Sequence, residues 1–67
     1  MLKYPLTAEL PACTEEEINQ TFEYMDAWRK DSASPFTFEL LYEIFPQYSG
    51  REAEVIFKSW NDANANR

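Results

Sequence analysis

The chain has no histidine, only one cysteine and only one glycine among its 67 residues. Histidine is the side chain that most often acts as a general base or metal ligand near neutral pH, and no serine has such a base to pair with. The single thiol, Cys13, excludes a disulfide within the chain and favours a reducing compartment. The sequence therefore predicts a cytoplasmic protein that is not an enzyme and holds neither a cofactor nor a metal ion.

Long apolar runs and basic residues are also scarce. There is no run of eighteen apolar residues, and Pro5 and Pro11 interrupt the apolar positions near the N-terminus, so we expect neither a transmembrane helix nor a signal peptide. Six basic residues against twelve acidic ones give a formal net charge of −6. This charge favours positively charged partners and disfavours nucleic acid, because it opposes the approach of a phosphate backbone. We expect no membrane partner.

Aromatic residues, by contrast, are abundant: five Phe, four Tyr and two Trp. Each buried ring removes roughly 150–250 Å² from water, which is how a short chain can offset the entropy lost on folding. Disordered segments are poor in such residues. We therefore expect one folded domain with its own hydrophobic core.

The first thirteen residues alternate between apolar and other positions. Leu2, Tyr4 and Leu6 fall on one face, which is typical of an extended segment with one buried side. Pro5 and Pro11 each lack a backbone N–H, so a central strand is excluded. The pattern predicts an extended arm over residues 1–13. This arm either covers the helices of its own chain or reaches a second chain.

A first helix is predicted over residues 14–31. Thr14 followed by Glu17 is a capping box, in which each side chain accepts a hydrogen bond from the other residue's backbone N–H. Arg29 and Lys30 favour the helix C-terminus. The apolar residues that follow the cap share one helical face: Ile18, Phe22, Met25 and Trp28.

Two further helices complete an all-α fold. Ser34-Pro35 is a strong helix start, and Pro46 ends the pattern, so a second helix is predicted over residues 35–45. A second capping box, Ser49 with Glu52, opens a third helix over residues 50–63. The three helices would form one domain over residues 14–64, followed by a frayed tail over residues 65–67.

The aromatic residues outside the predicted core stripes suggest the function. Large rings exceed what three short helices readily bury, and exposed aromatic residues are common at the centres of protein interfaces. The alternative is that the second helix lies between the other two with the arm above it, so that all of its faces are covered. The predicted partner-binding residues are Tyr4, Tyr24, Phe38, Tyr42 and Tyr48. We expect a small acidic interaction or regulatory module that binds a partner protein or a second copy of itself.

An alternative is a DNA-binding regulator that acts as a dimer. The second and third predicted helices, joined by a short turn, have the outline of a helix-turn-helix domain without a wing. On that template Arg51, Val55 and Lys58 of the third helix would contact DNA. The few cations on this helix would give only weak anchoring to phosphates.

Overall fold

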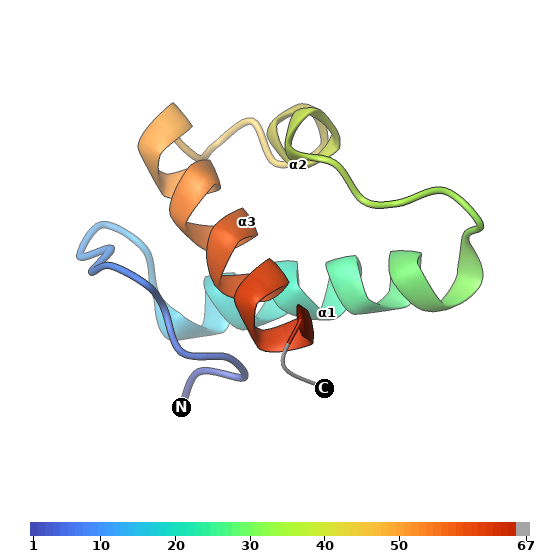
Figure 1. Cartoon of the computed structure of the whole chain (residues 1–67). Helices are drawn as coiled ribbons and strands as arrows, with labels where there is room; N and C mark the ends of the chain where they lie inside the picture. The colour runs from blue at the N-terminus through green and yellow to red at the C-terminus, as the bar shows by residue number, and fades with distance from the viewer. Residues whose placement is uncertain (66–67) are drawn as a thin grey trace.

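The computed structural model describes residues 1–65 and confirms the all-α fold with three helices. These are α1 (Glu15–Asp31), α2 (Phe38–Ile44) and α3 (Gly50–Ala65) (Figure 1). None of them is long and apolar enough to cross a membrane. The N-terminal arm and the connections between helices contain no strand within the described residues.

Side-chain hydrogen bonds confirm two of the predicted helix N-caps. At α3 the capping box is complete: the Ser49 N–H donates to Glu52 Oε1 at 2.9 Å, and the Glu52 N–H donates to Ser49 Oγ at 3.2 Å. At α1 the Glu17 N–H donates to Thr14 Oγ1 at 3.1 Å. The helices begin where these side chains replace the hydrogen bonds that the first turn cannot make for itself.

The predicted start of the second helix is wrong by three residues. Helix α2 begins at Phe38, and Thr37 is its N-cap, with its hydroxyl accepting from the Leu40 N–H at 3.2 Å. Ser34 stays in the linker, where its carbonyl accepts a hydrogen bond from Trp28 Nε1 at 3.1 Å. The later start leaves Phe36 free to insert its ring into the core, which a helix beginning at Pro35 would not allow in the same geometry.

The ends of the helices differ less from the predictions. Helix α2 stops at Ile44, with Phe45 as its C-cap, one residue before the predicted end. Helix α3 continues to Ala65, two residues beyond its predicted end. The predicted frayed tail thus begins inside α3, and its last two residues, Asn66 and Arg67, lie outside the described residues.

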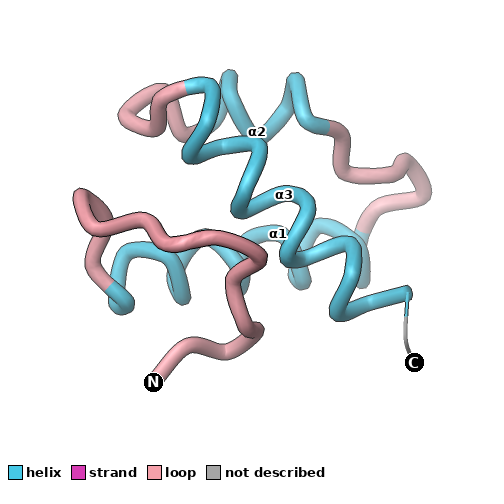
Figure 2. The backbone as a smooth tube through the Cα atoms, turned by 60° about the vertical axis from the view of Figure 1, so that its left-hand side comes forward, coloured by secondary structure: helices cyan, strands magenta, loops and turns pink. Residues whose placement is uncertain are grey.

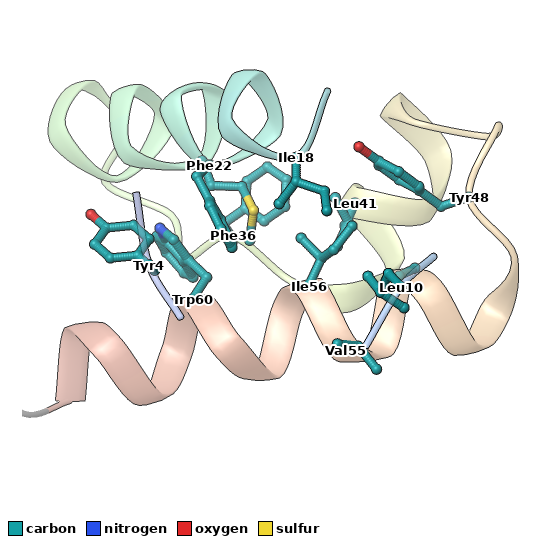
Figure 3. Close-up of a cluster of buried hydrophobic side chains, with 12 residues drawn as sticks. Tyr4, Leu10, Ile18, Phe22, Phe36, Leu41, Tyr48, Val55, Ile56 and Trp60 are labelled. Carbon is teal, nitrogen blue, oxygen red and sulfur yellow. The ribbon is translucent and has the colours of Figure 1, made fainter. Parts of the chain in front are cut away.

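Helix α3 lies at the centre of the fold and packs against both α2 and α1. Figure 3 shows the buried side chains that these helices share with the linker and the arm. The least exposed aliphatic and phenylalanine side chains come from all three helices: Ile18, Phe22, Met25, Leu41, Ala53 and Ile56. Phe36 joins them from the linker, with its ring centroid 5.7 Å from that of Trp28 and 6.2 Å from that of Trp60.

The arm packs on α1 and α3 of its own chain (Figure 2). The Cys13 thiol donates to Glu52 Oε2 at 3.4 Å, and the Thr7 N–H donates to Ser59 Oγ at 2.9 Å. Later arm residues thus meet earlier residues of α3, so the arm runs antiparallel to this helix. Leu10, between the two hydrogen-bonding positions, is buried in the core cluster.

Candidate functional site

Every aromatic ring of the protein contacts another ring. Most of the rings form one connected network with centroid separations between 5.5 and 6.5 Å, while Tyr4 and Phe22 make a separate edge-to-face pair at 5.1 Å. Such pairs contribute roughly 0.5–1.5 kcal/mol beyond the area that they bury. The network therefore extends from the core to the surface without a break in ring contacts.

The part of this network that reaches solvent crosses all three helices, and we call it, apart from the partly exposed Trp28, the aromatic ridge. It consists of Tyr24 from α1, Phe38 and Tyr42 from α2, Phe45 at the end of α2, and Phe57 from α3. Tyr42 is 48% exposed and Tyr24 is 41% exposed, while the three phenylalanines are half-buried.

Helix α2 connects the two ends of the ridge. Phe38, Tyr42 and Phe45 are spaced four and three residues apart, so they lie on one side of this helix. The Phe38 ring stacks on Tyr42 at 6.2 Å and meets Phe57 edge-on at 6.1 Å. At the other end the Phe45 ring meets Tyr24 edge-on at 5.5 Å. The half-buried rings hold the exposed tyrosine rings in fixed positions.

Carboxylates flank the ridge on α2. Glu39 and Glu43 are the only charged residues of this helix, and both are exposed. They stand one turn apart, each directly after a ridge residue, so they share a face next to the ring stripe. This part of the surface therefore combines apolar rings with negative charge and contains no cation from α2.

Three of the five residues predicted to bind a partner lie on the aromatic ridge: Phe38 and Tyr42 are in ring contact with each other, and Tyr24 contacts Phe45 at the other end. The surface placement predicted for Tyr4 and Tyr48 is corrected, since they are only 7% and 2% exposed. Both rings are buried because their hydroxyl groups find partners inside the fold.

The two buried hydroxyl groups bond to residues of α1. Tyr48 Oη lies 2.6 Å from Thr21 Oγ1, and Tyr4 Oη donates to Asp26 Oδ2 at 2.7 Å. Burial raises the pKa of the Tyr48 hydroxyl, so it stays protonated at neutral pH. A tyrosine can enter a core once its hydroxyl is satisfied, and the sequence alone does not reveal these partners.

Phe45 and Phe57 were not predicted to be part of an exposed surface. Phe45 falls on the apolar face predicted for the second helix, and Phe57 falls on the apolar face of the third. Phe45 follows Tyr42 by three residues, and this spacing was the one sign in the sequence that the two rings share a side of the helix. Phe57 gives no such signal, because its contact with Phe38 depends on how α2 and α3 pack.

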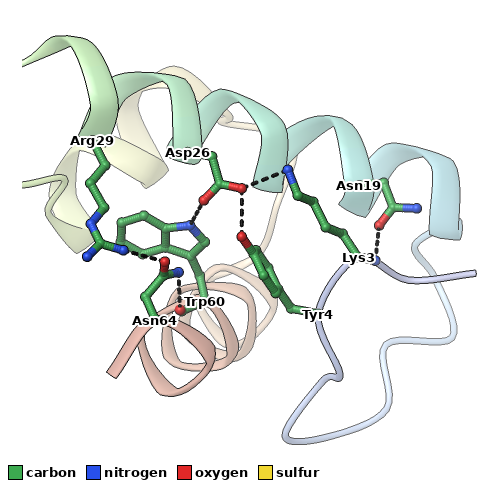
Figure 4. A network of polar contacts seen from close by, with 7 residues as sticks. All are labelled: Lys3, Tyr4, Asn19, Asp26, Arg29, Trp60 and Asn64. Atoms are coloured by element: carbon green, nitrogen blue, oxygen red, sulfur yellow. Dashed lines mark hydrogen bonds and ion pairs between the residues drawn. The ribbon is translucent and has the colours of Figure 1, made fainter. Parts of the chain in front are cut away.

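Asp26 is another residue that the sequence analysis missed, and it organises the polar cluster in Figure 4. Its Oδ1 accepts from Trp60 Nε1 at 2.9 Å, and its Oδ2 lies 2.8 Å from Lys3 Nζ. With the Tyr4 hydroxyl, this carboxylate joins the arm, α1 and α3. Its position four residues after the buried Phe22, at the edge of the apolar stripe, was the only hint in the sequence.

The lone thiol is not activated. Burial, together with the hydrogen bond to Glu52 and its negative charge, raises the pKa of Cys13 to about 11. The thiol is therefore protonated at neutral pH, whereas a nucleophilic cysteine needs a lowered pKa.

The residues predicted to contact DNA are not arranged for that purpose on one face. Val55 is only 8% exposed, and the arm passes over it, since Cys13 and Thr7 bond to α3 on either side. Arg51 and Lys58 are exposed. Three of the remaining cations line a pocket elsewhere, at the C-terminal ends of α1 and α3. The described cations do not gather along α3, so the DNA-binding alternative gains no support from their placement.

No protein-family model, curated protein sequence or solved structure matches this chain. The function is therefore inferred from its own residues.

Proposed function

We propose that this protein is a non-catalytic interaction module that binds a basic segment of a partner protein on the aromatic ridge. The observation that carries this proposal is the exposure of Tyr42 and Tyr24 at 48% and 41%, each in contact with a half-buried ring, Phe38 and Phe45 respectively. An isolated exposed tyrosine is ordinary, but exposed rings supported by half-buried rings resemble the centre of a binding surface.

The rings suit binding because they are large and already ordered. Stacking between Phe38 and Tyr42 and the edge-on contact between Phe45 and Tyr24 limit their motion before a partner arrives. An ordered ring loses little conformational entropy on binding, so more of its contact energy contributes to affinity.

The charges select the class of partner. Glu39 and Glu43 beside the ridge, together with the net charge of −6, attract Lys and Arg side chains and speed their approach. Tyrosine faces also attract cations directly. A segment that alternates basic and apolar residues would place its cations on the carboxylates and its apolar side chains on the rings.

The test is a titration of the ¹⁵N-labelled protein with a short peptide in which Arg and Leu alternate. We expect a saturable change at the amides of α2 and no saturation with the matching Glu–Leu peptide. The Tyr42→Ala variant should weaken binding about fivefold or more, as for other central interface residues. Gln20→Ala, an exposed change on α1, should leave the affinity unchanged.

A charge-matched pair of variants separates local from overall attraction. Glu39→Gln with Glu43→Gln removes two charges beside the ridge, and Glu9→Gln with Glu16→Gln removes two exposed charges elsewhere. Only the first pair should weaken binding strongly. Equal weakening by both pairs, or an unchanged affinity in Tyr42→Ala, would overturn the proposal.

Light scattering at two protein concentrations decides whether the partner is a second copy. A dimer that becomes a monomer in Tyr42→Ala would make the ridge a self-association surface and would contradict the basic partner. A monomer in both proteins agrees with a separate partner.

A further inference from the structure

A second surface feature differs in chemistry from the aromatic ridge and does not depend on it. A pocket of about 420 Å³ opens between the last turns of α1, the start of the arm and the end of α3. The residues that line it are polar or charged: Lys3, Tyr4, Asp26, Arg29, Lys30 and Asn64.

Positive charge is concentrated here in an otherwise acidic protein. Three of the five basic side chains in residues 1–65 line the pocket, while Asp26 is its one acidic residue. The other two cations, Arg51 and Lys58, lie roughly 120–140° away from Asn64 around the axis of α3, as follows from about 3.6 residues per turn. The side chains that line the pocket thus have a local charge of +2, from three cations and one carboxylate, although the chain carries −6.

The carboxylate of Asp26 already has hydrogen-bond and ion-pair partners within the fold. Its two oxygens accept from Trp60 and Tyr4, and its ion pair is with Lys3 (Figure 4). A new ligand therefore meets a carboxylate whose charge and lone pairs are largely satisfied within the fold.

The other two cations, Arg29 and Lys30, have no carboxylate partner among the residues that the structure describes. The Arg29 guanidinium donates to the neutral side-chain oxygen of Asn64, which leaves most of its N–H donors available. Within residues 1–65, no carboxylate forms an ion pair with Arg29 or Lys30. Two positive charges at this pocket thus have no counter-ion from residues 1–65.

The helix dipole accounts for only part of this arrangement. Arg29 and Lys30 stand in the last turn of α1, where roughly half a negative charge at the helix end favours cations. That effect falls off within one turn, so it does not explain why the arm brings Lys3 and why α3 brings the Asn64 amide to the same pocket.

We propose that this pocket binds the phosphate group of a small phosphomonoester or of inorganic phosphate. A phosphomonoester carries a charge of about −1.5 to −2 at pH 7, which matches the local charge, whereas a carboxylate supplies only −1. The planar guanidinium of Arg29 can present two parallel donors to phosphate oxygens, and the Lys30 ammonium adds a point charge.

The two tryptophans provide a reporter and an internal control. The Trp60 indole N–H bonds to Asp26 at the pocket, and the Trp28 indole N–H bonds to the Ser34 carbonyl outside its lining. In a titration with sodium phosphate at constant ionic strength, we expect a saturable shift of the Trp60 indole signal and little change for Trp28. Glycerol phosphate in a parallel titration shows whether the organic group adds affinity. Sodium acetate should give no saturable shift.

Two double variants with the same change in net charge complete the test. Arg29→Gln with Lys30→Gln should weaken phosphate binding roughly tenfold or more, because both unpaired cations are lost. Arg51→Gln with Lys58→Gln should change it less than about twofold. Circular dichroism of both proteins checks that they fold, since these four side chains are exposed.

Three results would overturn the proposal. They are a linear, non-saturating response to phosphate, equal weakening by the two double variants, and acetate binding as strong as phosphate binding. None of them bears on the aromatic ridge, whose charges and rings are not altered by the Arg29 and Lys30 substitutions.

Discussion

Phe22 and Tyr42 are both aromatic residues on helices, yet Phe22 is fully buried and Tyr42 is nearly half exposed. Phe22 lies on the apolar stripe of α1, where the arm and α3 cover it. The Tyr42 ring stacks on Phe38 of the same helix and keeps almost half of its surface exposed. Position on the helix, rather than residue type, thus separates a core ring from a ring available to a partner.

The stability cost of removing each ring should follow this difference. Phe22→Ala should lower the free energy of unfolding by about 3–5 kcal/mol, because the fold cannot fill the cavity that it leaves. Tyr42→Ala should lower it by about 1 kcal/mol or less. Urea unfolding followed by circular dichroism measures both values, and losses of similar size would contradict the assignment of Tyr42 to the surface.

At the scale of the helices, short-range signals predicted α1 and α3 well and α2 less well. The caps at Thr14 and Ser49 depend on residues three positions apart, so the sequence carries enough information to place these helix starts. For α2 the sequence predicted Ser34 as the cap, whereas the structure uses Thr37. The choice between them depends on Phe36 entering the core between residues of α1 and α3, which is a tertiary contact that local patterns do not encode.

This choice between caps predicts different effects for two similar substitutions. Thr37→Ala should cost about 1 kcal/mol of stability, because the Leu40 N–H loses its acceptor. Ser34→Ala should cost less than about 0.5 kcal/mol, since the contribution of Ser34 comes from its carbonyl, which alanine keeps. Thermal unfolding of the two variants provides the comparison, and a larger loss in Ser34→Ala would favour the earlier helix start.

At the scale of the whole molecule, the arm is integrated into the domain. Tyr4 and Leu10 belong to the same buried cluster as the helices, and Asp26 ties the arm to α1 and α3. The alternating pattern predicted an extended arm but left open which chain it would contact. The candidate site was predicted only in part, because exposure depends on which side chains find partners across elements, as Tyr4 and Tyr48 do.

Because Asp26 links the arm to α1 and α3, the free energy of unfolding should depend on pH in the acidic range. Burial by itself raises the pKa of Asp26, but hydrogen bonds from Lys3, Tyr4 and Trp60 together lower it below its ordinary value of 3.8. A carboxyl group with a lowered pKa stabilises the fold above its unfolded pKa, and this stabilisation is lost as the pH falls through the folded value. The hydrogen bond to Asp26 raises the pKa of Lys3 above 10.5, so the ion pair persists at neutral pH.

The measurement compares the wild-type protein with Asp26→Asn over a range of pH. At neutral pH the variant should be less stable, and below about pH 4 the difference should shrink as Asp26 becomes protonated in the wild type. Chemical unfolding at several pH values gives both curves. If the two proteins lost stability in parallel as the pH falls, ionisation of Asp26 would not be the cause of the pH dependence.

The antiparallel course of the arm along α3 also affects the order in which the fold can be completed. Thr7 bonds to Ser59, which is synthesised 52 residues later, and Cys13 bonds to Glu52, which is 39 residues later. On the ribosome, the arm therefore has no α3 to bind until almost all of the described residues after it have been synthesised. Closing such long loops is slow and entropically costly, so the apolar face of the arm stays uncovered throughout most of synthesis.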